Sequence, residues 1–277
     1  MSGGRACGIL LRNEWFKARK SLAFRLPLGF YAFWVFVNHA NAFFRDEDSV
    51  RFPEIWSSIF GVGTPFVLVF SVLTLLLLTA SEFNWRTARQ NVIDGLSKSQ
   101  WFRGKFLLFP IVGTAFIAVH ILIPVALALI RTDFGGTEGP LVSAPVFAAT
   151  GGLILAFLSA SAFAFFLAMT IRRSAPAVGV WFLWVFPLES GMITPVVNRY
   201  LPEFSDWIRY LPWINTFPLL EFRNYDAAAY ERYAAPALEV GGTPMPAVDP
   251  TSHLLVAAAW AVLFLGTAFI WFRRRDL

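Results

Sequence analysis

The apolar residues of this chain are gathered in blocks long enough to cross a lipid bilayer. About 20 mostly apolar residues span the hydrocarbon core as a helix, and a window of about 19 residues finds six such blocks here. The chain is 57% hydrophobic and only 15% charged, a balance that few soluble domains have. The blocks lie near Phe24–Phe43, Ser58–Ala80, Phe106–Ile130, Pro145–Ile171, Ala175–Val197 and His253–Phe272. We therefore expect an all-α polytopic membrane protein with six spanning helices, forming one transmembrane domain over residues 1–277.

The basic residues are unevenly divided between the segments that connect these blocks. With six spans and an inner N-terminus, the inner segments hold 16 of the 23 Lys and Arg residues and four acids, and the outer segments hold 13 acids. The positive-inside rule then places both termini and the segment Glu82–Lys105 in the cytoplasm. The net charge of +5 is thus a sign of topology, and no nucleic-acid motif accompanies it.

The stretch Thr79–Lys105 is polar and lies between two apolar blocks. No Pro or Gly occurs between Pro65 and Gly95, so one helix is expected to continue to Asp94 and to project roughly 20 Å beyond the bilayer, at about 1.5 Å per residue. Gly95 fits the end of that helix. The stretch therefore predicts a helical hairpin outside the membrane, where a soluble partner can bind.

Two local patterns refine this hairpin. Ser97 and Gln100 have the spacing of a capping box, which opens the next helix and sets the tip at residues 95–99. Glu82 and Arg86 are four residues apart with the acid first, the favourable order for an ion pair on a helix surface.

The N-terminal segment Ile9–Leu22 has an amphipathic pattern. Leu11, Trp15, Ala18 and Leu22 fall on one face of a helical wheel, whereas the basic residues lie elsewhere. This predicts a basic amphipathic helix on the inner membrane surface. An ordinary basic N-terminus that only sets topology fits the pattern equally well.

The spans contain two polar residues of interest. His120 fits a hydrogen bond in helix packing better than a ligand or proton relay, although the sequence shows no partner for it. Glu189 is the one acid deep in a span, where an ionisable group indicates substrate contact or coupling to a cation. Because Pro187 and Gly191 flank Glu189, a locally broken helix near the outer interface with a solvated, structural carboxylate is an equal alternative.

The fourth block and the turn that follows it predict close packing. Its small residues, Gly151, Gly152 and Ser159–Ala162, suit a face where helices approach closely. The turn Arg172–Ser174 is very short, so the fourth and fifth helices are expected to form a tight hairpin.

The outer region, residues 198–251, is too long for an ordinary connection. Its first half mixes prolines with large apolar residues, which predicts short amphipathic or re-entrant helices. Its second half, Tyr225–Pro250, is polar and rich in Ala, Gly and Pro, and predicts an exposed cap or a loose loop.

The motifs of common catalytic and metal sites do not occur in the sequence. No phosphate-binding loop is present, since Ser99 stands where the first glycine of the motif before Gly104-Lys105 belongs. The three histidines are far apart and Cys7 is the single cysteine. We expect no enzyme activity, no metal site and no ATP site in this chain.

The chain resembles the membrane (permease) subunits of type-2 ATP-binding-cassette (ABC) transporters, an exporter family with six spans. The matching segments are L-L-R-N-E-W-F-K-A-R-K (Leu10–Lys20), E-F-N-W-R-T-A-R-Q-N-V-I-D-G-L-S-K-S-Q-W-F-R-G-K (Glu82–Lys105) and L-P-W-I-N-T-F-P (Leu211–Pro218). Within the second segment, the family's plan fits Glu82, Thr87, Asp94, Ser97, Gly104 and Lys105. The family commonly has Gly before this Thr, where Arg86 stands here.

The resemblance implies a permease subunit, acting as an exporter, that forms a pathway as a homo- or heterodimer in the bilayer of a bacterial cytoplasmic membrane. A separate ATPase subunit would hold ATP and Mg. It would dock on a coupling helix made of Asp94, Gly95, Leu96, Ser97, Lys98, Ser99, Gln100 and Trp101. A gate or elbow would consist of Glu82, Arg86, Thr87, Arg89, Lys105, Trp15 and Lys17.

Two other classes of protein fit the sequence. A secondary transporter would need internal repeats, and no convincing repeat relates the two halves. A membrane scaffold or sensor would account equally well for the outer region and the polar hairpin. The transported cargo is left open.

Overall fold

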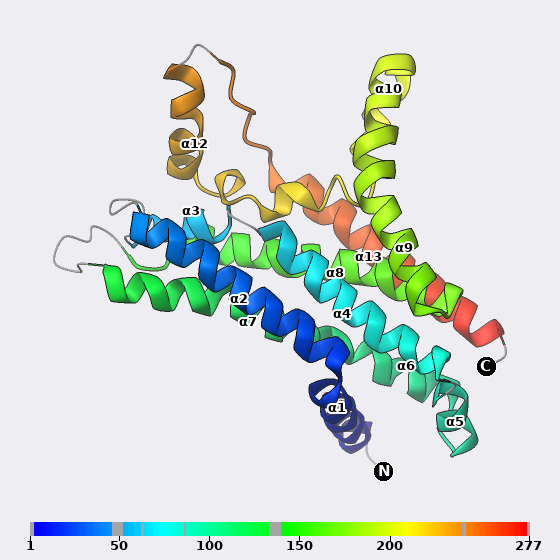
Figure 1. Cartoon of the computed structure of the whole chain (residues 1–277). Coiled ribbons are helices and arrows are strands. Elements are labelled where there is room, and N and C mark those ends of the chain that lie inside the picture. Colours follow the sequence, from blue (N-terminus) through cyan, green and yellow to red (C-terminus); the bar gives the residue numbers. More distant parts are fainter. Residues whose placement is uncertain are drawn as a thin grey trace.

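The structure is a computed structural model of the whole chain, and it describes residues 3–45, 52–61, 64–85, 87–132, 140–239 and 242–275. All regular elements within these ranges are helical (Figure 1). The long helices are α1 (Gly3–Lys20), α2 (Leu22–Arg45), α4 (Thr64–Asn84), α7 (Leu108–Arg131), α8 (Ala144–Ile171), α9 (Ser174–Leu183), α12 (Ala227–Glu239) and α13 (Pro250–Arg274). The shorter ones are α3 (Ile55–Ile59), α5 (Thr87–Ile93), α6 (Lys98–Phe106), α10 (Thr194–Tyr200) and α11 (Ser205–Ile208). The π-helix η2 (Trp184–Ile193) joins α9 to α10, and η3 (Pro202–Phe204), η4 (Phe217–Leu220) and η5 (Phe222–Asn224) are 3₁₀ turns.

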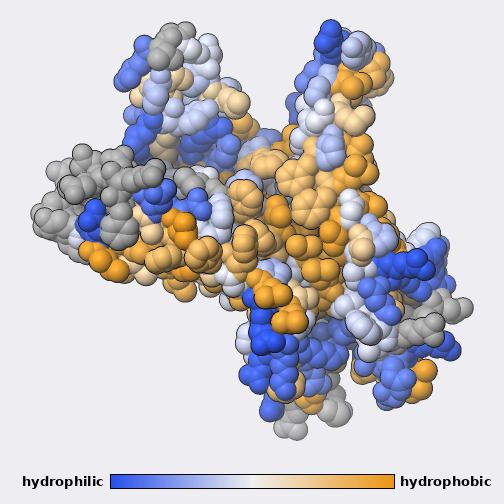
Figure 2. Space-filling view, viewed as in Figure 1, coloured by the Kyte–Doolittle hydropathy of each residue, from blue (hydrophilic) through white to orange (hydrophobic). Residues whose placement is uncertain are grey.

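Five segments are long and apolar enough to cross a membrane. They are Thr64–Asn84, Lys98–Arg131, Ala144–Ile171, Ser174–Tyr200 and Pro250–Arg274. Helix α2, the first expected span, passes the same test only together with α1, from which it is bent by 67°, so six spans result if this pair counts as one. The chain thus has the composition of a multi-pass helical membrane protein. Figure 2 shows apolar residues over its middle and hydrophilic residues over its projecting ends.

Helix α8 lies at the centre of the bundle and packs against α13 and α4. The small residues Ser159–Ala162 are buried there, as predicted. Gly152 is also required, because a Cβ at this position would lie 2.1 Å from the hydroxyl oxygen of Tyr225. Gly151 faces open space and takes no part in this packing.

Both ends of α4 differ from the prediction. Ser58 lies in the separate helix α3, and α4 begins at Thr64, whose hydroxyl donates to the carbonyl of Ile59 (3.2 Å). The expected single helix to Asp94 is wrong, because α4 ends at Asn84 and α5 begins at Thr87. The Thr87 hydroxyl donates to the carbonyl of Glu82 (3.1 Å), a local bond that competes with the helical pattern.

The turn between α8 and α9 is as short as predicted. Helix α8 ends at Ile171, Arg172 has a left-handed backbone (φ 58°), and α9 begins at Ser174. The amide of Asn84, at the end of α4, donates to the hydroxyl of Ser174 (2.7 Å). This turn therefore lies at the same end of the bundle as α5 and α6, which we call the hairpin end.

The region 198–251 lies at the opposite end and has two parts. Around η4 the chain forms turns instead of the expected helices and is buried against α8, α13 and α4, whereas α10 projects away from the bundle (Figure 1). In the second part, α12 forms where a cap or loop was expected, because an Ala-rich sequence follows Asp226, whose side chain accepts the N–H of Ala229 (2.7 Å).

The packing interpretation of His120 is the one that the structure favours. Its Nδ1 lies 2.8 Å from the hydroxyl of Tyr31 on α2, and both side chains are fully buried. The pair is 89 residues apart, so it could not be recognised in the sequence.

Candidate functional site

The tip of the α5–α6 hairpin is fixed by backbone hydrogen bonds. The N–H of Leu96 donates to the carbonyl of Asn91 (3.1 Å), and the N–H of Gly95 donates to that of Val92 (3.1 Å). These two bonds form a Schellman motif. Gly95 has φ +104°, a conformation that side chains other than glycine rarely adopt. The predicted stop at Gly95 is therefore confirmed.

The start of α6 is capped as predicted. Ser97 Oγ accepts the N–H of Gln100 (3.2 Å), and Gln100 Oε1 accepts the N–H of Ser97 (2.9 Å), which completes a capping box. Next to it, Lys98 Nζ donates to the backbone carbonyl of Arg275 (2.9 Å). The tip is thus rigid and is also joined to the end of α13.

The hairpin presents apolar residues to its surroundings. Ile93 is 66% exposed, and Trp85, just before the hairpin, is 79% exposed. Asp94 accepts a hydrogen bond from the Gln90 amide (2.9 Å), which keeps its carboxylate close to α5. A polar hairpin with an exposed isoleucine beside a fixed turn has the features of a binding surface for a partner protein.

The base of the hairpin carries a buried cluster of charged residues. Lys105 on α6 is only 2% exposed. Its Nζ donates to Glu14 Oε2 on α1 (2.6 Å) and to Glu82 Oε1 on α4 (2.5 Å). A buried ammonium requires such compensation, because an unpaired charge in the protein interior is strongly destabilising.

Two further side chains complete this cluster. Trp101 Nε1 donates to Glu82 Oε2 (3.0 Å), and the Trp101 ring stacks on Phe272 of α13 with centroids 5.0 Å apart. Lys17 Nζ lies 3.3 Å from Glu14 and 3.4 Å from Glu82. Burial opposes the charge of Lys17, but the two carboxylates outweigh it and raise the pKa of this lysine above its usual value.

The cluster, defined as Glu14, Lys17, Glu82, Trp101 and Lys105, joins four elements at one point. It connects α1, the end of α4, the helix α6 and, through Phe272, the end of α13. Its two carboxylates are balanced by two ammonium groups. A displacement of the hairpin must therefore carry α1 along or break buried ionic contacts.

Three of the predicted elbow residues, Lys17, Glu82 and Lys105, meet in this cluster, whereas others do not belong to it. Thr87 donates to the backbone carbonyl of Glu82 in the bond described above, and Arg89 is exposed. Trp15 is half exposed and packs edge-on against Phe24 (6.2 Å between centroids). Arg86 lies outside the described residues, so the expected pair between Glu82 and Arg86 stays a prediction.

Glu14 is a site residue that was not predicted from the sequence. A signal for it existed, because Glu14 is buried on the same face of α1 as Ala18 and lies three residues before Lys17. An acid on the packed face of an otherwise basic helix requires a cation on the neighbouring element.

Glu189 is a structural carboxylate in this structure. It is fully buried in η2, and its Oε1 accepts the backbone N–H groups of Trp213 (2.6 Å) and Ile214 (2.8 Å). Its Oε2 accepts Trp184 Nε1 (2.7 Å). Glu189 thus caps the first turn of the segment 211–220, which supports a structural role. The expected solvation is wrong because the side chain is fully buried, and the helix continues through this point as the π-helix η2. The π-helical geometry of η2 agrees with the flanking proline and glycine.

The fold and this site define a multi-pass helical membrane protein with a rigid polar hairpin at one end of its bundle. Residues 35–277 match the family described as "Protein of unknown function (DUF2705)", and the chain belongs to this family. It is similar to the uncharacterized protein YhcI of Bacillus subtilis (strain 168), with 24% identity over 243 residues that cover 80% of this chain and 69% of the relative. The family match begins after α1, so Glu14 and Lys17 precede it.

Proposed function

We propose that this chain is the permease subunit of an ABC exporter and that a separate ATPase docks on the α5–α6 hairpin. The observation that carries the proposal is the hairpin itself: a tip fixed by a Schellman motif and a capping box, an exposed Ile93 beside it, and a buried charged cluster at its base. A docking element needs such rigidity to pass on the motion of its partner.

The route of that motion does not run through an extended α4. Helix α4 ends at Asn84, so it is no rigid extension into the hairpin. Helices α6 and α7 instead form one nearly continuous segment, Lys98–Arg131. A displacement at the tip would pass along α6 into α7 and, through Lys105, into α1.

The rest of the proposal follows the topology and the resemblance. The hairpin and both termini lie in the cytoplasm by the positive-inside rule, and two permease subunits enclose the pathway in the membrane. ATP and Mg bind to the partner ATPase. The chain supplies the pathway and the docking surface.

The test is an affinity pull-down of the tagged protein from gently solubilised native membranes, with mass spectrometry of the bound proteins. We expect a stoichiometric ATPase with the wild type. Ile93→Asp places a charge at the exposed apolar position, and D94K/K98E reverses two charges at the tip. Each variant should reduce the recovery of the ATPase at least tenfold. The matched control, E203K/D206K, changes exposed acids at the opposite end and should leave recovery unchanged.

The outcomes separate the candidate functions. If the ATPase is recovered equally with all variants, it does not dock on the hairpin. If no ATPase binds to the intact wild type, the ABC proposal is wrong, and a secondary transporter or a membrane scaffold takes its place.

A further inference from the structure

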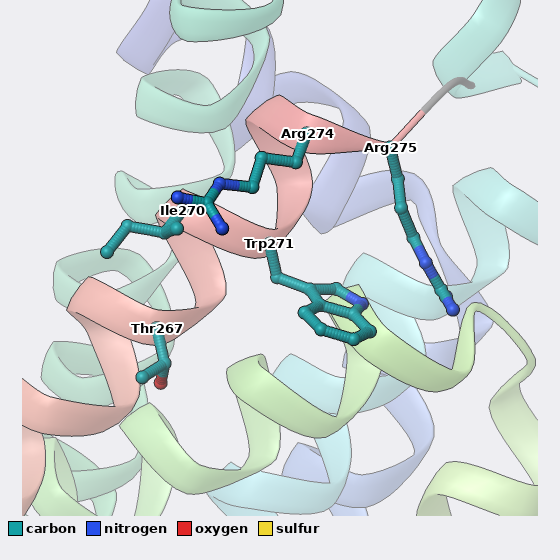
Figure 3. Close-up of a pocket in the computed structure, with 5 residues that line it drawn as sticks. All are labelled: Thr267, Ile270, Trp271, Arg274 and Arg275. Atoms are coloured by element: carbon teal, nitrogen blue, oxygen red, sulfur yellow. The ribbon is translucent and has the colours of Figure 1, made fainter.

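The C-terminal turns of α13 carry two neighbouring hollows that share a ridge. The first, of about 220 Å³, is lined by Thr267, Ile270, Trp271, Arg274 and Arg275 (Figure 3). The second, of about 400 Å³, is lined by Phe269, Ile270, Arg273 and Arg274. Ile270 and Arg274 line both hollows and therefore form the ridge between them.

The hollows change from apolar to basic along the helix axis. Ile270 and Trp271 are about half exposed, and Arg273 and Arg274 follow them in the last turn. In Figure 3 the Arg274 side chain folds back along the helix toward Ile270. A tryptophan and arginines at the end of a spanning helix lie at the depth of lipid headgroups.

The arginines at this site differ in the contacts that the protein makes with their guanidinium groups. The Arg275 guanidinium donates to the carbonyl of Thr170 (3.3 Å) and lies over the Trp271 ring (4.7 Å from its centroid). Arg273 lies over the ring of Phe269 (5.6 Å). Within the described ranges no carboxylate pairs with Arg273 or Arg274, so their guanidinium groups are available to an anion from outside.

We propose that this site binds an anionic phospholipid. The phosphate lies between Arg273 and Arg274, whose planar guanidinium groups bind phosphate oxygens in pairs, and the two acyl chains lie in the two hollows on either side of Ile270. The charge of arginine in a last turn also complements the helix dipole. The dipole, however, accounts for neither the paired hollows nor their shared ridge.

The site is connected to the hairpin. Arg275 lines the first hollow, and its backbone carbonyl accepts a hydrogen bond from Lys98 on α6 (2.9 Å). A lipid held at Arg274 therefore steadies the end of α13 against which the hairpin tip rests. This inference does not depend on the proposed transport function, because a scaffold or sensor with the same fold would bind the same lipid.

The first experiment measures thermal unfolding of the purified full chain in detergent by tryptophan fluorescence. Phosphatidylglycerol should raise the midpoint by several degrees more than phosphatidylcholine with the same acyl chains. The variant R273Q/R274Q should lose at least half of this difference. The matched control R89Q/R103Q removes two exposed arginines from the same end of the bundle, away from the hollows, and should keep the difference.

A second measurement uses only the wild type, so it holds even where a variant folds poorly. Native mass spectrometry after exchange into an equimolar mixture of the two lipids should show at least a threefold preference for retained phosphatidylglycerol. Equal retention of both lipids, or an equal loss of protection in the two double variants, would overturn the proposal. Glycerol phosphate should give no protection, and protection by it would show a site for a free phosphate instead of a lipid.

Discussion

Replacing Lys105 by methionine tests whether the charged cluster holds the base of the hairpin. Lys105 donates to Glu14 at 2.6 Å and to Glu82 at 2.5 Å and is nearly fully buried. With an effective dielectric constant of about 20, each such contact is worth about 6 kcal/mol of Coulomb attraction, much of which offsets the cost of burying the charges. Lys105→Met leaves the two carboxylates with only the half-exposed Lys17 as a cation, which costs about 3–5 kcal/mol.

The expected loss is large enough to measure by thermal unfolding. For a chain of this size, each 1 kcal/mol shifts the midpoint by about 2–4 °C, so Lys105→Met should lower it by on the order of 10 °C. Lys17→Met is the matched control. Lys17 is 51% exposed and lies 3.3–3.4 Å from the same carboxylates, so its removal should cost less than about 1 kcal/mol.

A third variant separates charge from packing. In E14Q/E82Q/K105M all three buried charges are gone. The unfolding midpoint should then recover more than half of the loss caused by Lys105→Met, because replacing a whole group of buried ions often changes stability little. A Lys105→Met protein that unfolds within 2 °C of the wild type, or a triple variant no better than the single one, would refute this account of the cluster.

Three further predictions use other contacts. Gly152→Ala should destabilise the protein by about 1–3 kcal/mol, because its Cβ would lie 2.1 Å from the Tyr225 hydroxyl, whereas the neighbouring Gly151→Ala should leave the unfolding midpoint unchanged. Glu189→Leu leaves the N–H groups of Trp213 and Ile214 unpaired and should cost about 1–3 kcal/mol of stability for each. Glu189→Gln should cost less. Equal unfolding midpoints for the two variants would exclude the capping role. Ser97→Ala should cost about 1 kcal/mol at the hairpin tip, visible as faster amide hydrogen exchange in residues 97–100 without a change in α13.

The features that could be predicted from the sequence are local ones. Gly95, Ser97 and Gln100 specify the hairpin tip within a few residues, because caps and left-handed turns depend on neighbouring side chains. The tight turn at Arg172–Ser174 and the buried small residues of α8 are local in the same sense. Pro187 and Gly191 likewise marked an irregular helix, and a π-helix occurs there.

The features that could not be predicted depend on distant partners. Lys105 and Glu14 are 91 residues apart, and nothing in the periodicity of α1 identifies the cation that Glu14 meets. The N–H groups capped by Glu189 lie 24 and 25 residues further along the chain. The end of α4 was missed for a related reason. Helix patterns give the extent of an apolar face but do not reveal that the Thr87 hydroxyl donates a hydrogen bond to the Glu82 carbonyl.

The attachments of the hairpin to the bundle differ in burial along α6, and they limit how the hairpin can move. At its base, Lys105 makes two short ionic contacts in a buried site. At its tip, Lys98 Nζ donates to the backbone carbonyl of Arg275 (2.9 Å) in a solvent-exposed contact. Between these two points the Trp101 ring stacks on Phe272 of α13 (5.0 Å between centroids). Helix α6 is therefore held along its length, and a force on the tip passes to α1 through Lys105 and to α13 through Trp101.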